Sequence, residues 1–255
     1  REEAESLISG NPKNRDVIRL YLRGEDLTTQ PDQKPTRYVI DFRDWSEEKC
    51  SREYPDCFSL VEARVKPQRL ALPDNNSTAR QRRRYWWRFS NDARELYRAL
   101  AGLARSFAIS RVTAHHVIAA AQTDIVLSER LVVFAFEKFA AFALLSSAIH
   151  EVWAYRPGTT THETRNTYFT AEAFETFCFP KQMESLERIG TQFYEIRSAS
   201  MKSRSEGLTV TYNRFHSPNE ESADIDELRK VHVRMDHAVA AAYGWDDLDL
   251  GHSFY

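Results

Sequence analysis

One group of residues resembles, in type and order, a metal-dependent catalytic set. Pro55-Asp56 precedes Glu62 and Lys66, an order similar to the PD…ExK set that holds Mg²⁺ in many nucleases. Only five residues separate the two acids, inside one expected helix, whereas such sites take their acids from separate strands. Arg64 also stands where the set has lysine. We therefore expect no magnesium site at Asp56 and Glu62.

Histidines occur in two patterns that are typical of metal ligands. His150-Glu151 begins like the zinc motif HExxH, whose second histidine stands four residues after the first so that both share a helix face. That position is Ala154, so we interpret His150 as the end of a buried helix or as a residue that hydrogen-bonds locally. His115-His116 lies in an expected strand, which directs the two side chains to opposite faces. The pair cannot chelate one metal ion, although either histidine could face a ligand.

The sequence lacks the loops that bind common cofactors. It has no GxGxxG, GxxxxGK[ST] or GxSxG motif, and no glycine-rich turn of the kind that binds S-adenosylmethionine (SAM). Residues 11–14, NPKN, lack the aromatic residue of the NPPY-type loop that holds a flipped adenine. We expect no catalytic residue, no cofactor site and no metal site in this chain.

Positive charge is concentrated in one stretch of a nearly neutral chain. The formal net charge is −2, yet residues 64–105 hold eleven Lys and Arg against three Asp and Glu. Four arginines, Arg82, Arg83, Arg84 and Arg88, lie within seven residues. A local basic field suits a phosphate backbone as partner. A solvated basic face remains the alternative.

Length and composition indicate a globular protein. With 255 residues and 42% hydrophobic content, the chain can form one large domain and a smaller extension. No apolar run approaches the roughly 20 residues that cross a bilayer, so we expect no membrane partner. The three cysteines form no CxxC pair, which favours a reducing, cytoplasmic setting. Because the chain opens at Arg1 without a signal peptide, we expect it to be a fragment of a longer polypeptide.

The first hundred residues predict alternating elements. Residues 38–42 read as a strand, and residues 46–66 as a helix that is interrupted at Pro55. Residues 73–78 form a clear loop before the arginines, and a second helix is expected from residue 90 to 105. We interpret Trp86 and Trp87 as core residues rather than as residues that stack on DNA bases.

The rest of the chain predicts a sheet and then helices. Short apolar runs at 108–112, 117–121 and 131–136 indicate strands of one sheet, and residues 139–153 a buried helix. Two amphipathic helices are expected after Pro180, with a loop between them; they span residues 183–204 and 225–242. We therefore predict an α/β (α+β) fold with a mixed sheet, divided into a domain at 1–180 and a helical segment at 181–255.

Several phrases together resemble one known family. Residues 174–180, FETFCFP, are similar to the FETFPFP signature that closes the target-recognition domain of MmeI-like type II restriction–modification enzymes and related phage-defence adenine methyltransferases. Further phrases match the family in order: YLRGEDL at 21–27, WWRF at 86–89, SRVTAH at 110–115, LLSSAIHEVW at 144–153, TYNRFH at 211–216 and AYGW at 242–245. Ala114 departs from the usual lysine, which leaves a contact from that loop in doubt.

The resemblance implies a role in reading DNA sequence. It places a SAM-dependent adenine-N6 methyltransferase domain just before Arg1 in the parent chain, with or without a Mg²⁺-dependent restriction nuclease ahead of it. The fragment would supply specificity for double-stranded DNA, with a fold similar to half of a type I specificity subunit. Adenine methylation needs such a domain to grip the duplex while the base is extruded.

The resemblance also implies which residues read bases. Carried over, they are Glu163, Arg165 and Thr167 in an extended polar segment, and Glu129 and Arg130 after a serine. On a strand the first three share a face, and an arginine with a glutamate can read one C·G pair. The alternatives stay open: a surface ion pair between Glu163 and Arg165, and a solvated turn at Glu129 and Arg130.

A function of another class also fits the sequence. The segment from residue 181 holds 9 Lys and Arg against 13 Asp and Glu, and it contains Trp245. An acidic helical tail of this kind suits a protein-interaction or scaffolding domain that docks on a partner chain. A steep salt dependence of DNA binding would separate the two functions.

Overall fold

The chain divides into two compact units, which are described separately. The computed structural model describes residues 1–89, 93–156, 166–252 and 254. Unit 1 contains residues 1–22, 35–98 and 125–127, and unit 2 contains residues 23–34, 99–124 and 128–255. Each unit is therefore assembled from three separate stretches of the chain.

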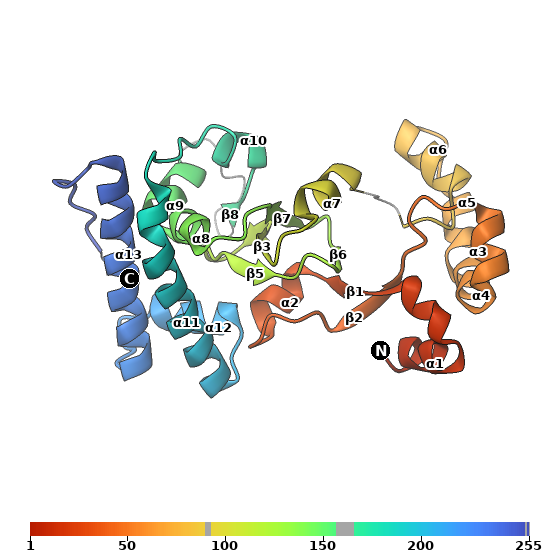
Figure 1. The fold of residues 1–255 in the computed structure, drawn as a ribbon, viewed down its shortest axis with the longest axis horizontal. Helices are drawn as coiled ribbons and strands as arrows, with labels where there is room; N and C mark the ends of the chain where they lie inside the picture. Colours follow the sequence, from red (N-terminus) through yellow and green to blue (C-terminus); the bar gives the residue numbers. More distant parts are fainter. Residues whose placement is uncertain (90–92, 157–165, 253, 255) are drawn as a thin grey trace. The chain divides into compact units, whose positions relative to one another are not determined.

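Unit 1 combines a small sheet with short helices (Figure 1). Its elements are α1 (Glu2–Gly10), the 3₁₀ helix η1 (Pro12–Asp16), β1 (Ile18–Leu22), β2 (Arg37–Ile40), α3 (Glu47–Glu53), α4 (Pro55–Arg64), α5 (Lys66–Leu70), α6 (Ser77–Arg84) and β6 (Val126–Leu127); α7 (Arg94–Leu100) leads towards unit 2. The sheet order is β2-β1-β6, with β2 antiparallel and β6 parallel to β1. The predicted strand at 38–42 and the helix break at Pro55 are confirmed, whereas α1 and α6 were not predicted.

An aromatic cluster forms the core of unit 1. Trp86 and Trp87 are 5% and 7% exposed, and the Trp87 indole N–H donates to the Trp45 carbonyl at 2.9 Å. The Trp86 ring packs on Phe58, with ring centroids 5.4 Å apart. The prediction that both tryptophans are core residues is confirmed.

Unit 2 contains a second sheet and the longest helices. Its elements are α2 (Gly24–Thr29), β3 (Ser106–Ser110), β4 (Val112–Thr113), β5 (Ala119–Ala121), β7 (Leu131–Phe134), α8 (Phe139–Ser146), α9 (Ala148–Ala154), β8 (Asn166–Thr167), α10 (Thr170–Ala173), the 3₁₀ helix η2 (Met183–Leu186), α11 (Glu187–Arg204), α12 (Leu208–Phe215) and α13 (Ala223–Tyr243). The three apolar runs form one antiparallel sheet in the order β5-β3-β7, as predicted. A separate ladder joins β4 to β8.

The expected helix at 139–153 is in fact two helices. Ser147 has extended backbone angles, φ −73° and ψ 153°, which end α8. Its hydroxyl accepts a hydrogen bond from the His150 N–H at 3.2 Å and so caps α9. The apolar pattern hid this break because apolar residues continue past the serine into α9. Helix α8 is buried throughout, whereas α9 exposes Val152 (73%) and Trp153 (37%), so the predicted burial holds for α8 alone. The prediction of one helix is therefore wrong.

Three helices pack side by side at the C-terminal end of unit 2. Figure 1 shows α11 between α8 and α13. Gly190 lets α11 approach α8, because a Cβ atom there would overlap the Phe139 carbonyl oxygen. A loop was predicted between the two long helices, but residues 208–215 of this segment form a further helix, α12.

The fold is α+β with a helical C-terminal part, as predicted. By contacts, residues 181–255 belong to the same unit as residues 99–124 and 128–180. The predicted division into a domain at 1–180 and a helical segment at 181–255 stays a prediction. Among the residues that the structure describes, no helix is long and apolar enough to cross a membrane.

Candidate nucleic-acid interface

The predicted backbone-binding arginines lie at the end of helix α6 in unit 1. Asn76 begins this helix, and its side-chain oxygen accepts a hydrogen bond from the Ala79 N–H at 2.8 Å. Arg82, Arg83 and Arg84 form its last turn, where cations interact favourably with the carbonyl end of a helix. Helix stability alone therefore favours arginine here, and only the lack of an acidic partner distinguishes a binding role.

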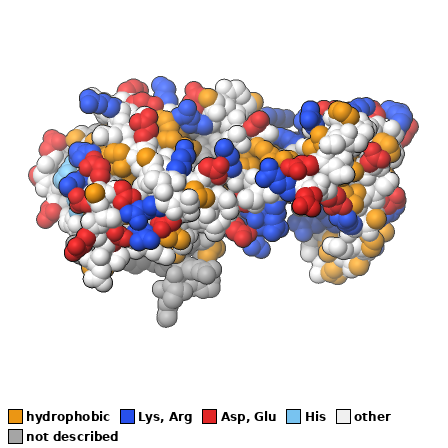
Figure 2. Space-filling model, turned by 90° about the horizontal axis from the view of Figure 1, so that it is seen from below, with side chains coloured by type: hydrophobic (Ala, Val, Ile, Leu, Met, Phe, Trp, Pro, Cys, Tyr) orange, Lys and Arg blue, Asp and Glu red, His pale blue; other side chains and the backbone are white. Residues whose placement is uncertain are grey.

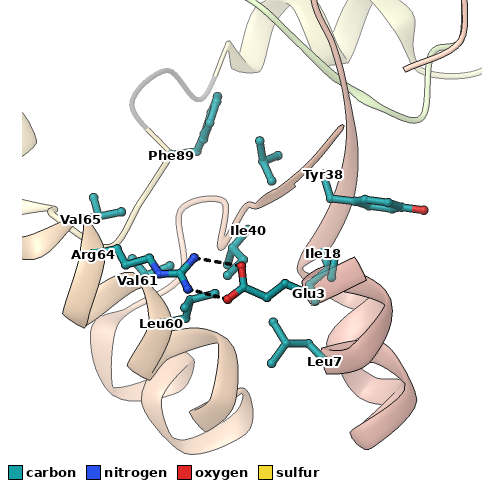
Figure 3. Close-up of a pocket in the computed structure, with 12 residues that line it drawn as sticks. Glu3, Leu7, Ile18, Tyr38, Ile40, Leu60, Val61, Arg64, Val65 and Phe89 are labelled. Carbon is teal, nitrogen blue, oxygen red and sulfur yellow. Dashed lines mark hydrogen bonds and ion pairs between the residues drawn. The ribbon is translucent and has the colours of Figure 1, made fainter. Parts of the chain in front are cut away.

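Many of the neighbouring basic side chains are already neutralised. Arg64 pairs with Glu3 at 2.6 Å, beside an apolar pocket of about 300 Å³ in unit 1 (Figure 3). Three other ion pairs in this unit are Lys66–Glu62, Arg80–Asp74 and Arg94–Asp44. The eleven basic residues of the sequence stretch thus overstate its free charge.

The α6 arginines differ from these paired neighbours. Within the described residues, Arg82, Arg83 and Arg84 form no ion pair with a carboxylate, and Arg82 and Arg84 are exposed. Arg69 is close enough to Arg82 that burial and this like charge lower the pKa of Arg69. Positive charge without a counter-charge is what a phosphate backbone neutralises. We call Arg82, Arg83 and Arg84 the α6 arginines.

Arg88 behaves differently from the other three predicted arginines. It is half-buried, and its guanidinium carbon lies 4.4 Å from the Tyr85 ring centroid and 5.6 Å from that of Trp87. Such stacking on two aromatic rings stabilises the packing at the surface of the aromatic cluster of unit 1. Arg88 therefore contributes mainly to packing, and we expect it to contribute less to phosphate binding than Arg82, Arg83 and Arg84.

A second surface forms in unit 2, where three distant chain segments meet. The Arg111 N–H donates to the Arg130 carbonyl at 2.8 Å, and the Tyr168 N–H donates to the Arg111 carbonyl at 2.8 Å. Next to this point, β4 pairs with β8. Arg111, Glu129 and Arg130 are all exposed. We call these three residues the charged edge.

The charged edge contains one predicted base-reading region, Glu129 and Arg130, and lies next to β8, which holds the predicted reader Thr167. Glu129 and Arg130 form a turn that the Ser128 hydroxyl supports by accepting from the Arg130 N–H at 3.3 Å. Arg111 was not predicted, although it lies in the SRVTAH phrase as an exposed charge between two strands. The sequence signal for Arg111 was a charged residue directly after the apolar run of β3.

The other three predicted base readers are Glu163, Arg165 and Thr167. Glu163 and Arg165 lie outside the described residues. Thr167 is in β8 and 8% exposed, so its hydroxyl is not offered to a ligand in this structure. We therefore do not propose Thr167 as a base reader.

The histidine pair lies in a connection between strands β4 and β5, so the predicted strand at this place is wrong. His116 is buried, with its Nε2 atom 2.7 Å from the Leu145 carbonyl oxygen. His115 faces elsewhere, with its Nε2 atom 2.8 Å from the Asn213 side-chain oxygen. Over the described part of the chain, no group of three or more His, Cys, Asp or Glu side chains is placed to hold a metal ion.

Elsewhere the surface carries mixed charge. On the face drawn in Figure 2, acidic and basic side chains are interspersed over unit 2. Ion pairs such as Arg204–Asp224 at 2.6 Å and Arg214–Glu206 at 2.9 Å belong to this unit. Unit 2 is therefore not uniformly basic on this face.

Comparison with known proteins gives similarity in fold but none in sequence. No family model matches the chain, and no curated protein matches it by sequence. A solved structure of the Type IIL restriction–modification enzyme MmeI in complex with DNA matches with a TM-score of 0.74 over 98% of this chain. The chain has the fold of a part of MmeI. Sequence identity is 18%, and the match spans 31% of the MmeI chain.

The MmeI match confirms, at the level of the fold, the resemblance that the sequence motifs indicated. It covers both units, including the helices after residue 180. Because MmeI is about three times longer than the matched region, its activities belong to a larger protein.

Proposed function

We propose that this chain recognises a sequence in double-stranded DNA for a SAM-dependent adenine-N6 methyltransferase carried by the same polypeptide. The observation that carries the proposal is the similarity in fold to MmeI, a restriction–modification enzyme determined with DNA, over nearly the whole chain. The sequence motifs of the MmeI-like family support it independently.

Two surfaces support different parts of this function. The α6 arginines would contact phosphates, which gives affinity without sequence information. The charged edge would meet base edges, because an arginine can donate two hydrogen bonds to guanine and a glutamate accepts from cytosine N4. Glu163 and Arg165 are proposed as further base readers on the strength of the sequence resemblance.

The chemistry would come from another part of the polypeptide. This chain lacks a SAM-binding loop and an NPPY-type loop, so its residues do not fit SAM. Methyl transfer, and any Mg²⁺-dependent cutting of DNA, would be carried out by other domains of the polypeptide. Its proposed partners are duplex DNA and the methyltransferase domain.

Binding of a short duplex by the 255-residue chain tests the proposal. Fluorescence anisotropy at rising salt should show affinity that falls roughly tenfold or more for a fourfold increase, as binding through several phosphates requires. Failure to bind at low salt would contradict it. That result would favour the alternative, protein interaction through the C-terminal helices, where Trp245 is 44% exposed and stacks on Tyr243 at 4.4 Å.

A further inference from the structure

A buried histidine–tyrosine pair lies directly behind the charged edge. His150 in α9 and Tyr168 after β8 are both 0% exposed, and a hydrogen bond of 2.9 Å joins His150 Nε2 to the Tyr168 hydroxyl. The Tyr168 N–H donates to the Arg111 carbonyl, and the Arg111 N–H donates to the Arg130 carbonyl. Three consecutive hydrogen bonds thus lead from a buried histidine to two exposed arginines.

Packing alone would not favour this pair. The Nδ1 atom of His150 is buried with no hydrogen-bond partner among the described residues. The His150 ring packs on Phe177 with centroids 4.4 Å apart, and the Tyr168 ring packs on Phe134 at 5.7 Å. A buried polar atom without a partner costs stability, whereas replacing both members of a buried pair by apolar side chains is often neutral or stabilising. Two apolar residues would therefore suit this site.

A second pair of the same kind supports the first. His116 Nε2 lies 2.7 Å from the Leu145 carbonyl oxygen, and its Nδ1 lies 3.3 Å from the Tyr155 hydroxyl. The His116 and His150 rings are in contact, with centroids 5.5 Å apart. The His150 ring therefore packs against His116, whose own position is fixed by two hydrogen bonds.

We infer that His150 is a positioning residue, which acts through Tyr168 to fix the backbone of Arg111 and Arg130 and so the direction in which the charged edge meets DNA. The inference rests on the proposed function. A hydrogen bond has a defined direction and length, whereas an aromatic ring in apolar contact can shift by fractions of an ångström. Recognition of bases by bidentate contacts depends on such placement.

Selection from a pool of DNA duplexes with randomised positions tests the inference on the 255-residue chain. The variants are Tyr168→Phe, the double variant His150→Leu with Tyr168→Phe, and His150→Gln, whose amide can restore a hydrogen bond to the Tyr168 hydroxyl. Tyr243→Phe is the matched control, because it removes a hydroxyl that donates to the Cys178 carbonyl in the same unit. Each is measured for base preference at every position, for affinity to random duplex and for Tm.

We expect Tyr168→Phe and the double variant to lose base preference on the order of fivefold at the positions read from the charged edge, the lower end of what one good bidentate contact provides. Affinity for random duplex should stay unchanged. The double variant should unfold at a Tm no lower than that of the wild type, since no polar atom is left without a partner. His150→Gln should retain much of the preference, and Tyr243→Phe all of it.

The possible failures are distinguishable. If the wild type binds no DNA or enriches no sequence, the proposed function fails. If the wild type enriches a sequence and both Tyr168 variants keep its full preference, only the positioning role is wrong. An equal loss at all positions, together with a lower Tm in the double variant, would also overturn it, because the pair would then serve stability alone.

Discussion

At the scale of single residues, the partner of an arginine decides what it can bind. Arg64 is exposed, yet Glu3 holds its guanidinium at 2.6 Å, so phosphate would have to displace a carboxylate. Arg82 has no such partner among the described residues, and it adds to the positive charge at Arg69. The two arginines are similar in exposure and differ in availability.

Replacing Arg82 and Arg83 by alanine should weaken binding to all duplexes about equally. The plot of log affinity against log salt should flatten by about two units, one for each lost phosphate contact. Titrations by fluorescence anisotropy at several salt concentrations measure both quantities. Arg52→Ala is the control, because Arg52 is exposed on α3 but paired with Glu53 at 3.5 Å. If both variants behave like the wild type, the α6 arginines only stabilise their helix.

Buried titratable groups predict how stability depends on pH. Burial lowers the pKa of His116 to about 4 and that of His150 to about 2, whereas burial and Asp236 raise the pKa of Glu151 to about 7. Below about pH 6.5 the unfolded chain takes up a proton on each histidine and the native state does not, so stability is lost on acidification. Glu151 has the opposite sign, because the native state takes up its proton between pH 7 and 4.5 and the unfolded state does not.

The free energy of unfolding should therefore fall by at least roughly 2 kcal/mol between pH 7 and pH 5, since two histidines outweigh one glutamate at about 1.4 kcal/mol per pH unit and proton. Burial lowers the pKa of His216 and His232 as well, which adds to the loss. Glu151→Gln removes the opposing contribution and should increase the loss by about 2 kcal/mol more. Urea unfolding at the two pH values measures it. An equal loss in variant and wild type would mean that Glu151 is not protonated in the native state near pH 5.

At the scale of elements, close helix packing sets the arrangement of unit 2. Gly190→Ala should lower stability by on the order of 2 kcal/mol, although alanine favours a helix interior by about 1 kcal/mol. The added Cβ would overlap the Phe139 carbonyl oxygen and lie 3.1 Å from the Ala143 Cβ atom, and backbone cannot move aside as a side chain can. Thermal unfolding of this variant and of Gln192→Ala, an exposed control on α11, decides the point. Equal Tm values would show that the two helices can separate without cost.

Elements with a strong apolar period were predictable, and those defined by a single polar contact were not. The three strands of the β5-β3-β7 sheet and the helices α11 and α13 follow directly from apolar spacing. The break between α8 and α9 depends on one serine hydroxyl, which an apolar pattern does not report. Helix α6 has a mostly charged sequence that begins at the Asn76 cap, so no apolar spacing predicts it, and its first two residues lie in the predicted loop at 73–78.

The candidate site was predictable in part for the same reason. Arg82 and Arg83 were predictable from the density of arginine after a turn, whereas Glu129 and Arg130 were predicted from the family resemblance. The assembly of Glu129 and Arg130 with Arg111 depends on backbone hydrogen bonds between segments 19 and 57 residues apart, which no local pattern encodes. The burial of Thr167 likewise follows from the pairing of β4 with β8.

At the scale of the whole molecule, the chain has no excess of positive charge. The chain carries a net charge of −2, and its acidic C-terminal segment would repel DNA at long range. Attraction must therefore come from local sites such as the α6 arginines, within about 10 Å at ordinary salt. Recognition by such a chain depends on contact geometry more than on long-range steering.

The whole chain should bind DNA without changing it. Asp56 and Glu62, the acids closest to a nuclease pattern, both lie on α4, and six residues of helix turn them about 120° apart around its axis. Glu62 is also paired with Lys66 at 2.7 Å, so the two carboxylates do not converge on one ion. Calorimetric titration with SAM should give no binding heat, and supercoiled plasmid with Mg²⁺ should stay uncut. Binding of SAM, or Mg²⁺-dependent nicking that disappears in Asp56→Asn or Glu62→Gln, would mean that this chain has a catalytic centre of its own.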